Sequence, residues 1–382
     1  MTDELERRVP AVVVGAGIAG VSAAAFLAQC MPDRGVVVVE QEPLPAQHAS
    51  GRSASVLSET SGHVAVCALA RLSRPFFESP PAGFTDHALL SPRGLMWVGE
   101  HGDEEALDAL AVVGASIRPS VHRVDAHEVA QRLPTFVLAA IAGGGVFEPD
   151  AMAIDTATAI GGFVRMLRDA GGELLVTAEA VRMEQHDDGS WTVSAGGHRF
   201  RTPVVVNAAG AWVDEVAQRS GVTPIGTQAM RRTAAIVPAP DSVSEWPLIM
   251  DIAGRYYCEP EAGGLLVSPA DETPSRPCDA QPDELDVALA LERVRDAAGL
   301  PLRAVRSAWA GLRTFAPDRA PVLGEDPTAP GFWWSAGQGG AGIKTAPAMG
   351  QLLAIMVTGG SLPDEALSLG LTPQALSPAR FR

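Results

Sequence analysis

The residues with the clearest chemical potential are three glycines near the start of the chain. Gly15, Gly17 and Gly20 follow the β-branched run 12–14 and precede a stretch rich in Ala and Leu that has helical character. In such a turn the first glycine allows the tight bend, the second lets backbone N–H groups approach a pyrophosphate, and the third lets the helix pack on the strand. The helix N-terminus then faces the phosphates, so the spacing predicts dinucleotide binding. The residues between the glycines are expected in the same turn: Ala16, Ile18 and Ala19.

A carboxylate stands at the end of the next valine-rich run, 36–39. Glu40 follows this run directly, and Gln41 comes after it. At this place a carboxylate accepts hydrogen bonds from an adenosine ribose and would repel a 2′-phosphate. These residues fit NAD and FAD equally well, so they leave the choice of dinucleotide open.

Three further segments could complete a cofactor site. The segment HASGRSASVLS at 48–58 is dense in small hydroxyl residues, and it is either a second loop over a pyrophosphate or a polar surface turn. Strand-like runs also lead into NAAGAW at 207–212 and GQGGAGIKT at 337–345. The expected cofactor contacts beyond the first turn are His48, Ser50, Gly51, Arg52, Ser53, Ala54, Ala180, Val181, Ala209, Gly210, Trp212, Gly311, Gly339, Gly340, Gly342, Ile343, Lys344 and Thr345.

The composition excludes several classes of function. The formal net charge is −16, and an acidic surface disfavours nucleic-acid binding and electrostatic docking to membranes. Among 29 cationic residues there is a single lysine, Lys344, so Schiff-base or P-loop lysine chemistry could use no other residue. The 4 cysteines form no CxxC pair, which indicates neither a disulfide framework nor a metal site and favours a reducing compartment.

The apolar stretch 9–31 has the hydropathy of a signal peptide or a membrane anchor. Its glycines suit a strand and a tight turn better than a continuous helix, and Glu6 weakens a basic N-terminal region. We therefore expect a folded cytoplasmic protein without membrane insertion.

Several longer motifs run in order through nearly the whole chain: VVVGAGIAG, HASGRSAS, PPAGFTDHALLSPR, VVNAAGAW, MRRTA, GRYYCEPEAGGLLVSPA, WAGLRTF and GQGGAGIKT. In this order they resemble the D-amino-acid oxidase and glycine oxidase type of FAD-dependent amine oxidoreductases, and within that family bacterial D-arginine dehydrogenase. The resemblance implies FAD as the cofactor. It also implies non-covalent binding, because Gly311 stands near the place where some relatives carry an attachment cysteine.

The resemblance also implies an α/β fold with two domains. A Rossmann-like FAD-binding domain of the GR2 type would be assembled from 9–85, 146–222 and 304–370. An inserted α+β substrate domain, 86–145 and 223–303, would rest on a largely antiparallel sheet, followed by a tail at 371–382. Alternating residues at 190–195 and 198–206 predict strands, and helical periodicity marks 155–169 and 284–298.

A carboxylate substrate needs a fixed cation, and a guanidinium is best shaped to bind it at two points. The resemblance selects Arg313 as the main clamp, with Arg232 and Tyr257 beside it. Because adjacent strand residues face opposite sides, Arg231 is expected in a surface ion pair and Tyr256 in packing. A surface ion pair is also the alternative for Arg232.

The implied reaction is hydride transfer from the substrate Cα to flavin N5, which leaves an imine that water hydrolyses to a keto acid and ammonia. The amine must be bound in its neutral form, and no strong general base is required. Lys344 has two interpretations, a positive charge near the flavin ring or a solvated lysine on a helix flank.

The expected substrate pocket departs from relatives that accept cationic side chains. Those relatives present a histidine, a tyrosine and an acid; the pocket here is expected to contain Val56, Ser61, Leu95 and Gly340. Without an acid, a buried cationic side chain is costly, so D-arginine and D-lysine should be poor substrates. An apolar amino acid, an imino acid or a pathway intermediate fits better, although Glu59 or Asp86 could restore a charge.

Other functions on the same fold remain open at this point. One alternative is an oxygen-using amine oxidase of the sarcosine or glycine oxidase type, and another is a 2-hydroxy-acid dehydrogenase. A flavin-binding subunit without turnover is a third. The electron acceptor is a quinone, another acceptor or O2.

Overall fold

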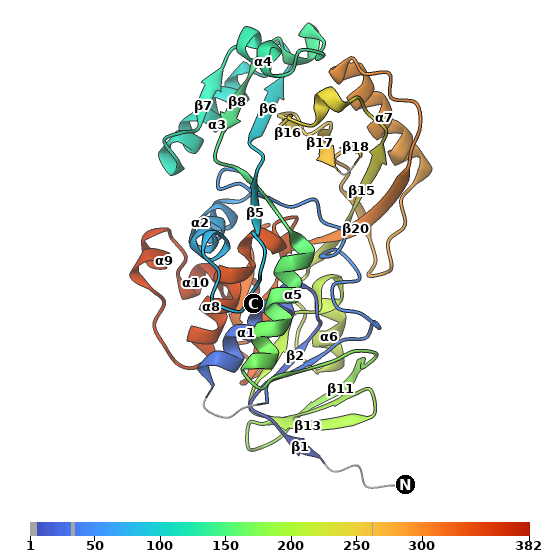
Figure 1. The fold of residues 1–382 in the computed structure, drawn as a ribbon. Coiled ribbons are helices and arrows are strands. Elements are labelled where there is room, and N and C mark those ends of the chain that lie inside the picture. Colours follow the sequence, from blue (N-terminus) through green and yellow to red (C-terminus); the bar gives the residue numbers. More distant parts are fainter. Residues whose placement is uncertain (1–5, 32–34, 262) are drawn as a thin grey trace.

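Buried valine-rich runs form a mainly parallel sheet, around which the lower part of the molecule in Figure 1 is built. The computed structural model describes residues 6–31, 35–261 and 263–382. Neighbouring strands are parallel except at the edge formed by β21. The order is β10 (Glu173–Leu175), β3 (Val37–Val39), β2 (Val12–Val14), β14 (Val205–Asn207), β22 (Phe332–Ala336) and β21 (Val322–Glu325). Both faces are covered, which explains the uninterrupted apolar runs in β2 and β3.

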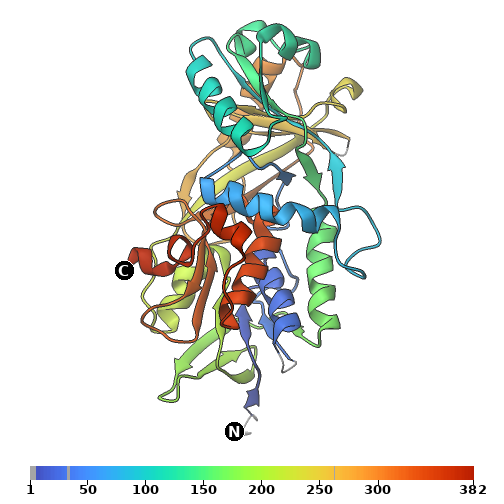
Figure 2. The same ribbon diagram turned by 90° about the vertical axis from the view of Figure 1, so that its left-hand side faces the viewer.

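Helices cover one face of the parallel sheet. They are α1 (Ile18–Cys30), α2 (Val64–Glu78), α5 (Thr156–Asp169) and α8 (Gly342–Val357). In Figure 2, α1, α5 and α8 stand side by side and α2 crosses them. The opposite face packs on α6 (Val213–Arg219) and on a small sheet in the order β1 (Arg7–Arg8), β13 (His198–Thr202), β12 (Trp191–Ala195) and β11 (Ala180–Gln185). This is the layered α/β arrangement that a dinucleotide-binding turn requires.

A large, largely antiparallel sheet forms the upper part of the molecule in Figure 1. Its order is β23 (Gln338–Gly339), β20 (Ser307–Phe315), β15 (Gln228–Val237), β18 (Gly264–Ser268), β17 (Tyr257–Glu261), β16 (Leu248–Asp251), β6 (Leu95–Gly99), β8 (Gly144–Glu148) and β7 (His122–Val124), with β19 (Thr273–Ser275) beside β15. Only the β16–β6 pair in this order is parallel. α4 (Ala126–Arg132) and α7 (Glu284–Ala298) pack with the face that carries Met96 and Cys258, while α3 (Glu104–Ile117) packs near β6, β7 and β8.

Shorter elements connect these layers. A small sheet joins β4 (Val56–Leu57), β9 (Met152–Ile154) and β5 (Leu90–Pro92). The last helices, α9 (Asp364–Ser368) and α10 (Pro373–Leu376), precede a 3-10 turn at Pro378–Phe381. Further 3-10 turns lie at Leu138–Ile141, Gly210–Trp212 and Asp241–Val243. Within the described residues, no helix has both the length and the apolar character needed to span a membrane.

The structure confirms the predicted fold class and refines its elements. The apolar N-terminal stretch becomes β2 and α1, and the predicted helices at 155–169 and 284–298 become α5 and α7. The predicted strand at 198–206 is divided between β13 and β14, which lie in different sheets, with Pro203 between them. Proline lacks a backbone N–H donor, so it ends the ladder at this point.

The proposed domain boundary at residue 304 does not follow the sheets. Strands from 9–85, 146–222 and 304–370 do meet in the parallel sheet, as β2, β14 and β22. However, β20 also lies within 304–370, and it pairs with β15 from Ser307 to Phe315. A strand of the stretch 304–370, which the resemblance assigns to the FAD-binding domain, is therefore part of the antiparallel sheet.

Candidate active site

A long cavity opens at the carboxyl ends of the parallel strands. Its wall includes Val14 at the end of β2, Val39 at the end of β3 and Ala208 just after β14. From there it continues to the antiparallel sheet, where Arg313 and Tyr257 also line it. Ligands of open α/β folds bind at this edge, because the loops that follow parallel strands converge there.

The first glycine turn leaves no room for side chains. Gly15 has a φ of +100°, and a Cβ on it would lie 2.7 Å from the carbonyl oxygen of Ala208. Gly17 is the N-cap of α1 and offers no side-chain cap; the Ile18 N–H donates to the Ser50 hydroxyl, so only part of the hydrogen-bonding capacity of this first turn remains for a ligand. A Cβ on Gly20 would lie 1.8 Å from the Gly15 carbonyl oxygen. Gly20 therefore does not line the cavity but lets α1 approach the turn.

The Glu40 carboxylate is fixed at the rim of the long cavity. Its Oε2 accepts a 2.6 Å hydrogen bond from the N–H of Ala16, and its Oε1 accepts one of 2.9 Å from Glu42 N–H. These bonds orient the carboxylate while Glu40 and Gln41 line the cavity. Ala16 itself is buried within the turn and does not line the cavity.

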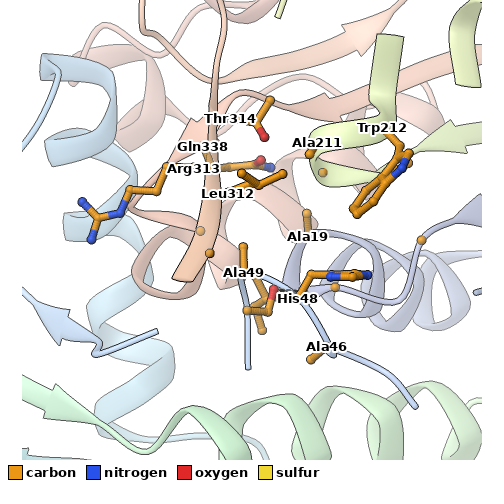
Figure 3. A pocket seen from close by; sticks show the side chains of 18 of the residues that line it. Ala19, Ala46, His48, Ala49, Ala211, Trp212, Leu312, Arg313, Thr314 and Gln338 are labelled. Carbon is orange, nitrogen blue, oxygen red and sulfur yellow. Dashed lines mark hydrogen bonds between the residues drawn. The ribbon is translucent and has the colours of Figure 1, made fainter. Parts of the chain in front are cut away.

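The second predicted loop packs directly on the start of α1. The hydroxyl of Ser50 accepts a 3.0 Å hydrogen bond from Ile18 N–H. The His48 ring lies 4.8 Å, centroid to centroid, from the Trp212 ring, and Figure 3 shows both rings on the same side of the cavity. Nε2 of His48 contacts Glu42, whereas its buried Nδ1 has no hydrogen-bond partner among the described residues and lies 3.9 Å from Asp279 Oδ1.

The prediction that Arg52 donates to a pyrophosphate is not supported by its contacts. Its guanidinium donates to the carbonyl oxygens of Ala280 at 2.9 Å and Ala310 at 2.8 Å, and it pairs with Asp279. Arg52 still lines the cavity, but its charge joins the second loop to the antiparallel sheet. Phosphate binding is left to backbone amides and hydroxyls.

Most of the remaining predicted cofactor residues line the long cavity. These are Ala19, Ser53, Ala54, Ala180, Ala209, Gly210, Gly311, Gly339, Gly340, Gly342 and Ile343. Gly51, Val181 and Thr345 do not line this cavity. Gly51 lies in a tight turn, where a Cβ would be 2.3 Å from the Ala46 carbonyl oxygen, and Val181 is exposed. The Thr345 hydroxyl donates a 2.9 Å hydrogen bond to the Ala341 carbonyl oxygen of its own helix. For Val181 the reason is the alternation of β11, because Ala180 faces the cavity.

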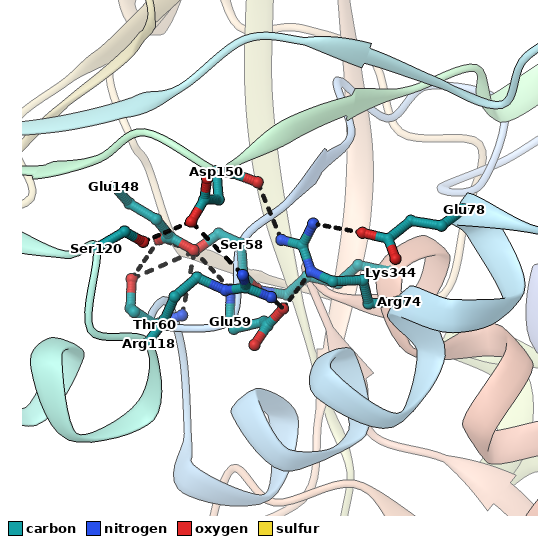
Figure 4. Close-up of polar contacts among 10 residues, drawn as sticks. All are labelled: Ser58, Glu59, Thr60, Arg74, Glu78, Arg118, Ser120, Glu148, Asp150 and Lys344. Atoms are coloured by element: carbon teal, nitrogen blue, oxygen red, sulfur yellow. Dashed lines mark hydrogen bonds and ion pairs between the residues drawn. The ribbon is translucent and has the colours of Figure 1, made fainter.

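Lys344 does not lie at the flavin turn as a free cation. Its buried Nζ donates to the carbonyl oxygens of Ser58 at 3.0 Å and Ser61 at 2.8 Å, and to the Ser61 hydroxyl at 2.8 Å. Burial lowers the pKa of Lys344, while the nearby Glu59 and Glu148 act in the opposite sense. Figure 4 shows Lys344 beside a polar network in which Glu59 pairs with Arg74 and Arg118. In the same network Glu148 accepts hydrogen bonds from the Ser58 hydroxyl and the Glu59 N–H. The interpretation as a solvated lysine is wrong, because the side chain is buried and holds the loop at 58–61 on α8. A positive charge near the flavin ring stays a prediction.

A second cavity of about 520 Å³ adjoins the first on the side of the antiparallel sheet. We call it the side cavity. The residues that line both cavities include Arg232, Tyr257, Arg313 and Gly340. These are the three predicted catalytic residues and one predicted pocket residue, so the structure brings them together at the junction.

The two arginines at this junction differ in their partners. Arg232 donates from Nε to the Asp271 carbonyl oxygen at 2.6 Å and pairs with Glu272 at 3.3 Å, whereas Arg313 forms no hydrogen bond or ion pair within the described part of the chain. Figure 3 shows the Arg313 side chain extending away from His48 and Trp212. Burial, with the positive charge of Arg313, lowers the pKa of Arg232 to about 10. Two facing guanidinium groups create a site for an anion.

Arg231 and Tyr256, the sequence neighbours of Arg232 and Tyr257, face away from the two cavities. Arg231 pairs with Asp286 at 2.8 Å, on α7, and does not line either cavity. Tyr256 is part of the core beneath the antiparallel sheet, and burial raises the pKa of its hydroxyl. Strand alternation thus separates each pair.

The wall of the side cavity contains the other predicted pocket residues, Val56, Ser61 and Leu95. The Ser61 hydroxyl is occupied by Lys344. Glu59 is buried in ion pairs with Arg74 and Arg118, and Asp86 is exposed, so neither restores a charge to this cavity.

Sequence reasoning missed several residues of the wall: Trp97, Leu248, Met250 and Glu259. Strand alternation gives the signal that could have found two of them. Trp97 is two residues after Leu95 and Glu259 is two residues after Tyr257, so each shares the face of a residue that was selected.

Comparison with known proteins decides the family. A family model described as FAD dependent oxidoreductase matches residues 11–356. The chain belongs to this family. It is 31% identical over 176 residues to FAD-dependent oxidoreductase domain-containing protein 1 of Bos taurus, which covers 41% of this chain and 36% of that protein. The chain therefore spans about a third of the length of this curated relative.

Solved structures of the same fold cover almost the whole chain. L-proline dehydrogenase from P. horikoshii has a TM-score of 0.84 and 18% identity, covering 99% of this chain and 98% of that one. Glycine oxidase from Geobacillus kaustophilus has a TM-score of 0.82 and 22% identity, covering 96% and 99% respectively. At these identities the likeness establishes the fold.

FAD is the cofactor of this family, and the long cavity fits it. The glycine turn and the uncapped starts of α1 and α8 present backbone amides to phosphates. Two buried polar atoms in the wall, His48 Nδ1 and Thr314 Oγ1, have no hydrogen-bond partner among the described residues and suit a polar ligand. Glu40 lies at the place expected for the adenosine ribose, and Arg313 lies at the opposite end of the long cavity, next to the antiparallel sheet.

Gly340 determines where the Arg313 guanidinium lies. A Cβ on Gly340 would be 2.9 Å from the guanidinium carbon, which forces this flexible side chain to move. We expect Gly340→Ala to raise KM for the substrate about tenfold while FAD content and Tm change little. Steady-state kinetics with a flavin absorbance spectrum and a thermal melt checks this. An unchanged KM would show that the position of Arg313 is not set by this contact.

Lys344→Met is expected to lower the free energy of unfolding by about 3 kcal/mol, because it leaves the buried carbonyl oxygens of Ser58 and Ser61 without their charged donor and removes a positive charge near Glu59 and Glu148. Denaturant titration of the holoenzyme measures this change. Ser61→Ala serves as the control, since it removes only one hydroxyl acceptor and should cost about 1 kcal/mol. A Lys344→Met variant as stable as wild type would contradict the structural role.

Proposed function

We propose that this family member oxidises the Cα–N bond of an amino acid or imino acid, giving an imine and then a keto acid with ammonia or an amine. The observation that carries the proposal is Arg313, which has no hydrogen bond or ion pair with another described residue and lies with Arg232 and Tyr257 where the two cavities meet. A free, partly buried guanidinium beside a second one is suited to a carboxylate.

The residues of the site have distinct tasks in this reaction. Arg313 binds the carboxylate at two points, Tyr257 donates its hydroxyl to the same group, and Arg232 contributes positive charge. The apolar neighbours Trp309 and Leu312 exclude water from this end of the cavity and strengthen the ion pair. Fixing the carboxylate orients the Cα–H bond, and the amine lone pair forms the C=N bond as the hydride leaves. When bound, FAD supplies the acceptor for that hydride.

The side cavity governs which substrate enters. Each carboxylate in its wall already has an arginine: Glu272 pairs with Arg319 and Arg232, Asp318 with Arg380, and Glu259 with Arg93. A cationic side chain would therefore lack a counter-charge and lose several kcal/mol on burial. We propose that arginine and lysine are poor substrates, in contrast to the D-arginine dehydrogenase that the motifs resemble.

Finer features of the proposal follow from the sequence resemblance. We propose the D configuration for the substrate and non-covalent FAD, since Gly311 offers no side chain for attachment. The electron acceptor is proposed to be a quinone or a similar carrier instead of O2.

An anaerobic screen tests the proposed function. The holoenzyme is mixed with D-amino acids, L-amino acids, secondary amines and 2-hydroxy acids, and loss of the flavin absorbance is followed. We expect rapid bleaching by at least one amino or imino acid and slow bleaching by hydroxy acids, arginine and lysine. Fastest reduction by a hydroxy acid would instead support a hydroxy-acid dehydrogenase. A second run in air, with peroxide measured, separates oxygen use from transfer to a dye.

A further inference from the structure

The wall of the side cavity is built by three neighbouring strands that present alternate residues to the same space. These residues are Leu95 and Trp97 of β6, Leu248 and Met250 of β16, and Tyr257 and Glu259 of β17. Strand register arranges them in two rows. Tyr257 lies opposite Met250, which lies opposite Trp97. Continuing the same antiparallel register places Glu259 beside Leu248, which lies opposite Leu95.

Glu259 is the polar member of an otherwise apolar row. It is only 4% exposed, and its one ion-pair contact within the described residues is with Arg93, 3.9 Å from Nε to Oε2. Neither carboxylate oxygen forms a hydrogen bond with another described residue. Burial raises the pKa of Glu259 to about 7, with Arg93 acting in the opposite sense. A buried carboxylate with spare acceptor capacity is costly unless a ligand uses it.

The position of Glu259 relative to Tyr257 sets the kind of ligand that reaches both. Two residues along a strand span about 6.7 Å. If Tyr257 holds the substrate carboxylate, a group at Glu259 lies at about the distance of the terminal nitrogen in a side chain of glutamine length. Because Arg93 already supplies a positive charge, the carboxylate needs a hydrogen-bond donor more than a second cation.

We propose that Glu259 determines specificity by accepting a hydrogen bond from an uncharged N–H or O–H donor at the end of the substrate side chain. This proposal rests on the proposed function and names its substrate class. The substrate is an amino acid with an apolar stem, which contacts Leu95, Leu248 and Met250, and a terminal donor such as a carboxamide. Relatives that accept cationic side chains have an acidic residue in this pocket, whereas this chain has apolar Leu95. Here Glu259, on a different strand, provides the polar contact to the end of the substrate side chain.

A comparison of three side chains of similar length tests the proposal: glutamine, norleucine and ornithine, each in the enantiomer that reduces the flavin faster. We expect wild-type kcat/KM for glutamine to exceed that for norleucine and for ornithine by at least tenfold. In Glu259→Met the glutamine-to-norleucine ratio should fall by at least tenfold, whereas Glu259→Gln, which keeps an acceptor oxygen, should retain most of it. Glu261→Gln is the matched control, because it removes an exposed carboxylate from the same strand and should leave the ratio unchanged.

A binding measurement separates recognition from turnover. Holoenzyme reduced with dithionite binds the amino acid but cannot oxidise it, so calorimetric titration gives Kd for each side chain. The same tenfold change should appear in Kd for glutamine when Glu259→Met is compared with wild type.

The pH dependence of the ratio of kcat/KM for glutamine to kcat/KM for norleucine is a further readout. Both substrates carry the same amine and carboxylate, so the titration of these groups affects both values alike and drops out of the ratio. The charged groups nearest Glu259 are Arg93 and, on its own strand, Glu261, while the facing residues of β6, β16 and β18 are uncharged. The other charged or titratable groups of the cavity wall are His63, Arg232, Glu272, Arg313, Asp318, Arg319 and Lys344. Glu259 is ionised above its raised pKa, and the ionised form is the stronger acceptor. The ratio should therefore rise as pH increases through about 7 in wild type and stay constant in Glu259→Gln.

Two results would overturn the proposal. A preference for norleucine or ornithine in wild type would show that Glu259 is not used as an acceptor for a neutral donor, and an unchanged ratio in Glu259→Met would remove it from recognition. If no amino acid at all reduces the flavin, the proposed function fails first, and this inference fails with it. If amino acids do reduce the flavin but glutamine is not preferred, or Glu259→Met does not change the preference, only this inference fails.

Discussion

Replacing Arg313 by glutamine is expected to lower kcat/KM for the best amino-acid substrate by about 10³-fold. Arg313 has no partner of its own within the described residues, so a substrate carboxylate would be its main ligand. Removing one member of a buried, hydrogen-bonded ion pair costs about 2–5 kcal/mol, and each 1.4 kcal/mol is a factor of about ten. Stopped-flow flavin reduction measures the loss, and a full flavin spectrum shows that the cofactor site is intact.

Arg231→Gln provides the matched control for Arg313→Gln. It also removes an arginine from the antiparallel sheet, but this arginine pairs with Asp286 outside both cavities. Its kcat/KM should stay within about threefold of wild type, because this partly buried ion pair faces away from the substrate. Equal losses in the two variants would mean that Arg313 acts through the fold and not through the substrate. Partial recovery in Arg313→Lys would favour charge recognition.

The second large effect is expected from Gly15→Ala, which should yield a protein with less than about a tenth of the wild-type FAD content. The backbone of Gly15 has a φ of +100°, and a new Cβ would lie 2.7 Å from the Ala208 carbonyl oxygen. An L-residue in the left-handed region alone costs about 1–2 kcal/mol, and the contact adds to it. The turn must then move away from the position that presents its amides to the pyrophosphate.

The ratio of flavin to protein absorbance checks this prediction, and circular dichroism shows whether the apoprotein is folded. Gly161→Ala is the control, because Gly161 lies in α5 with no atom within 4 Å of a new Cβ. That variant should keep its FAD and gain slightly in helix stability. Wild-type FAD content in Gly15→Ala would contradict the proposed path of the cofactor.

Local patterns were sufficient to predict the parts of the site that depend on neighbours in sequence. The glycine spacing from Gly15 to Gly20 needs only a strand, a turn and a helix, and all three are present. Alternation along a strand correctly separated Arg232 from Arg231 and Tyr257 from Tyr256, because adjacent side chains leave a sheet in opposite directions.

Sequence reasoning could not anticipate the contacts between distant segments. Arg52 finds acceptors at Ala280 and Ala310, and Lys344 finds them at Ser58 and Ser61. A long flexible cation reaches whichever acceptors the fold brings near, and this cannot be read from its own segment. Alternation from Tyr257 could have placed Glu259 on the cavity face, but its position beside Leu248 and Leu95 depends on which strands pair, and the sequence does not show this.

One anaerobic turnover tests the central claim most directly. Holoenzyme is mixed with excess of its best amino-acid substrate, and flavin reduction, keto acid and ammonia are quantified in the same sample. The proposed function predicts one keto acid and one ammonia for each flavin reduced, with reduction about 10³-fold slower at low substrate in Arg313→Gln. Flavin reduced only by a hydroxy acid, without ammonia, or reduced at an equal rate in the Arg313→Gln variant, would contradict it.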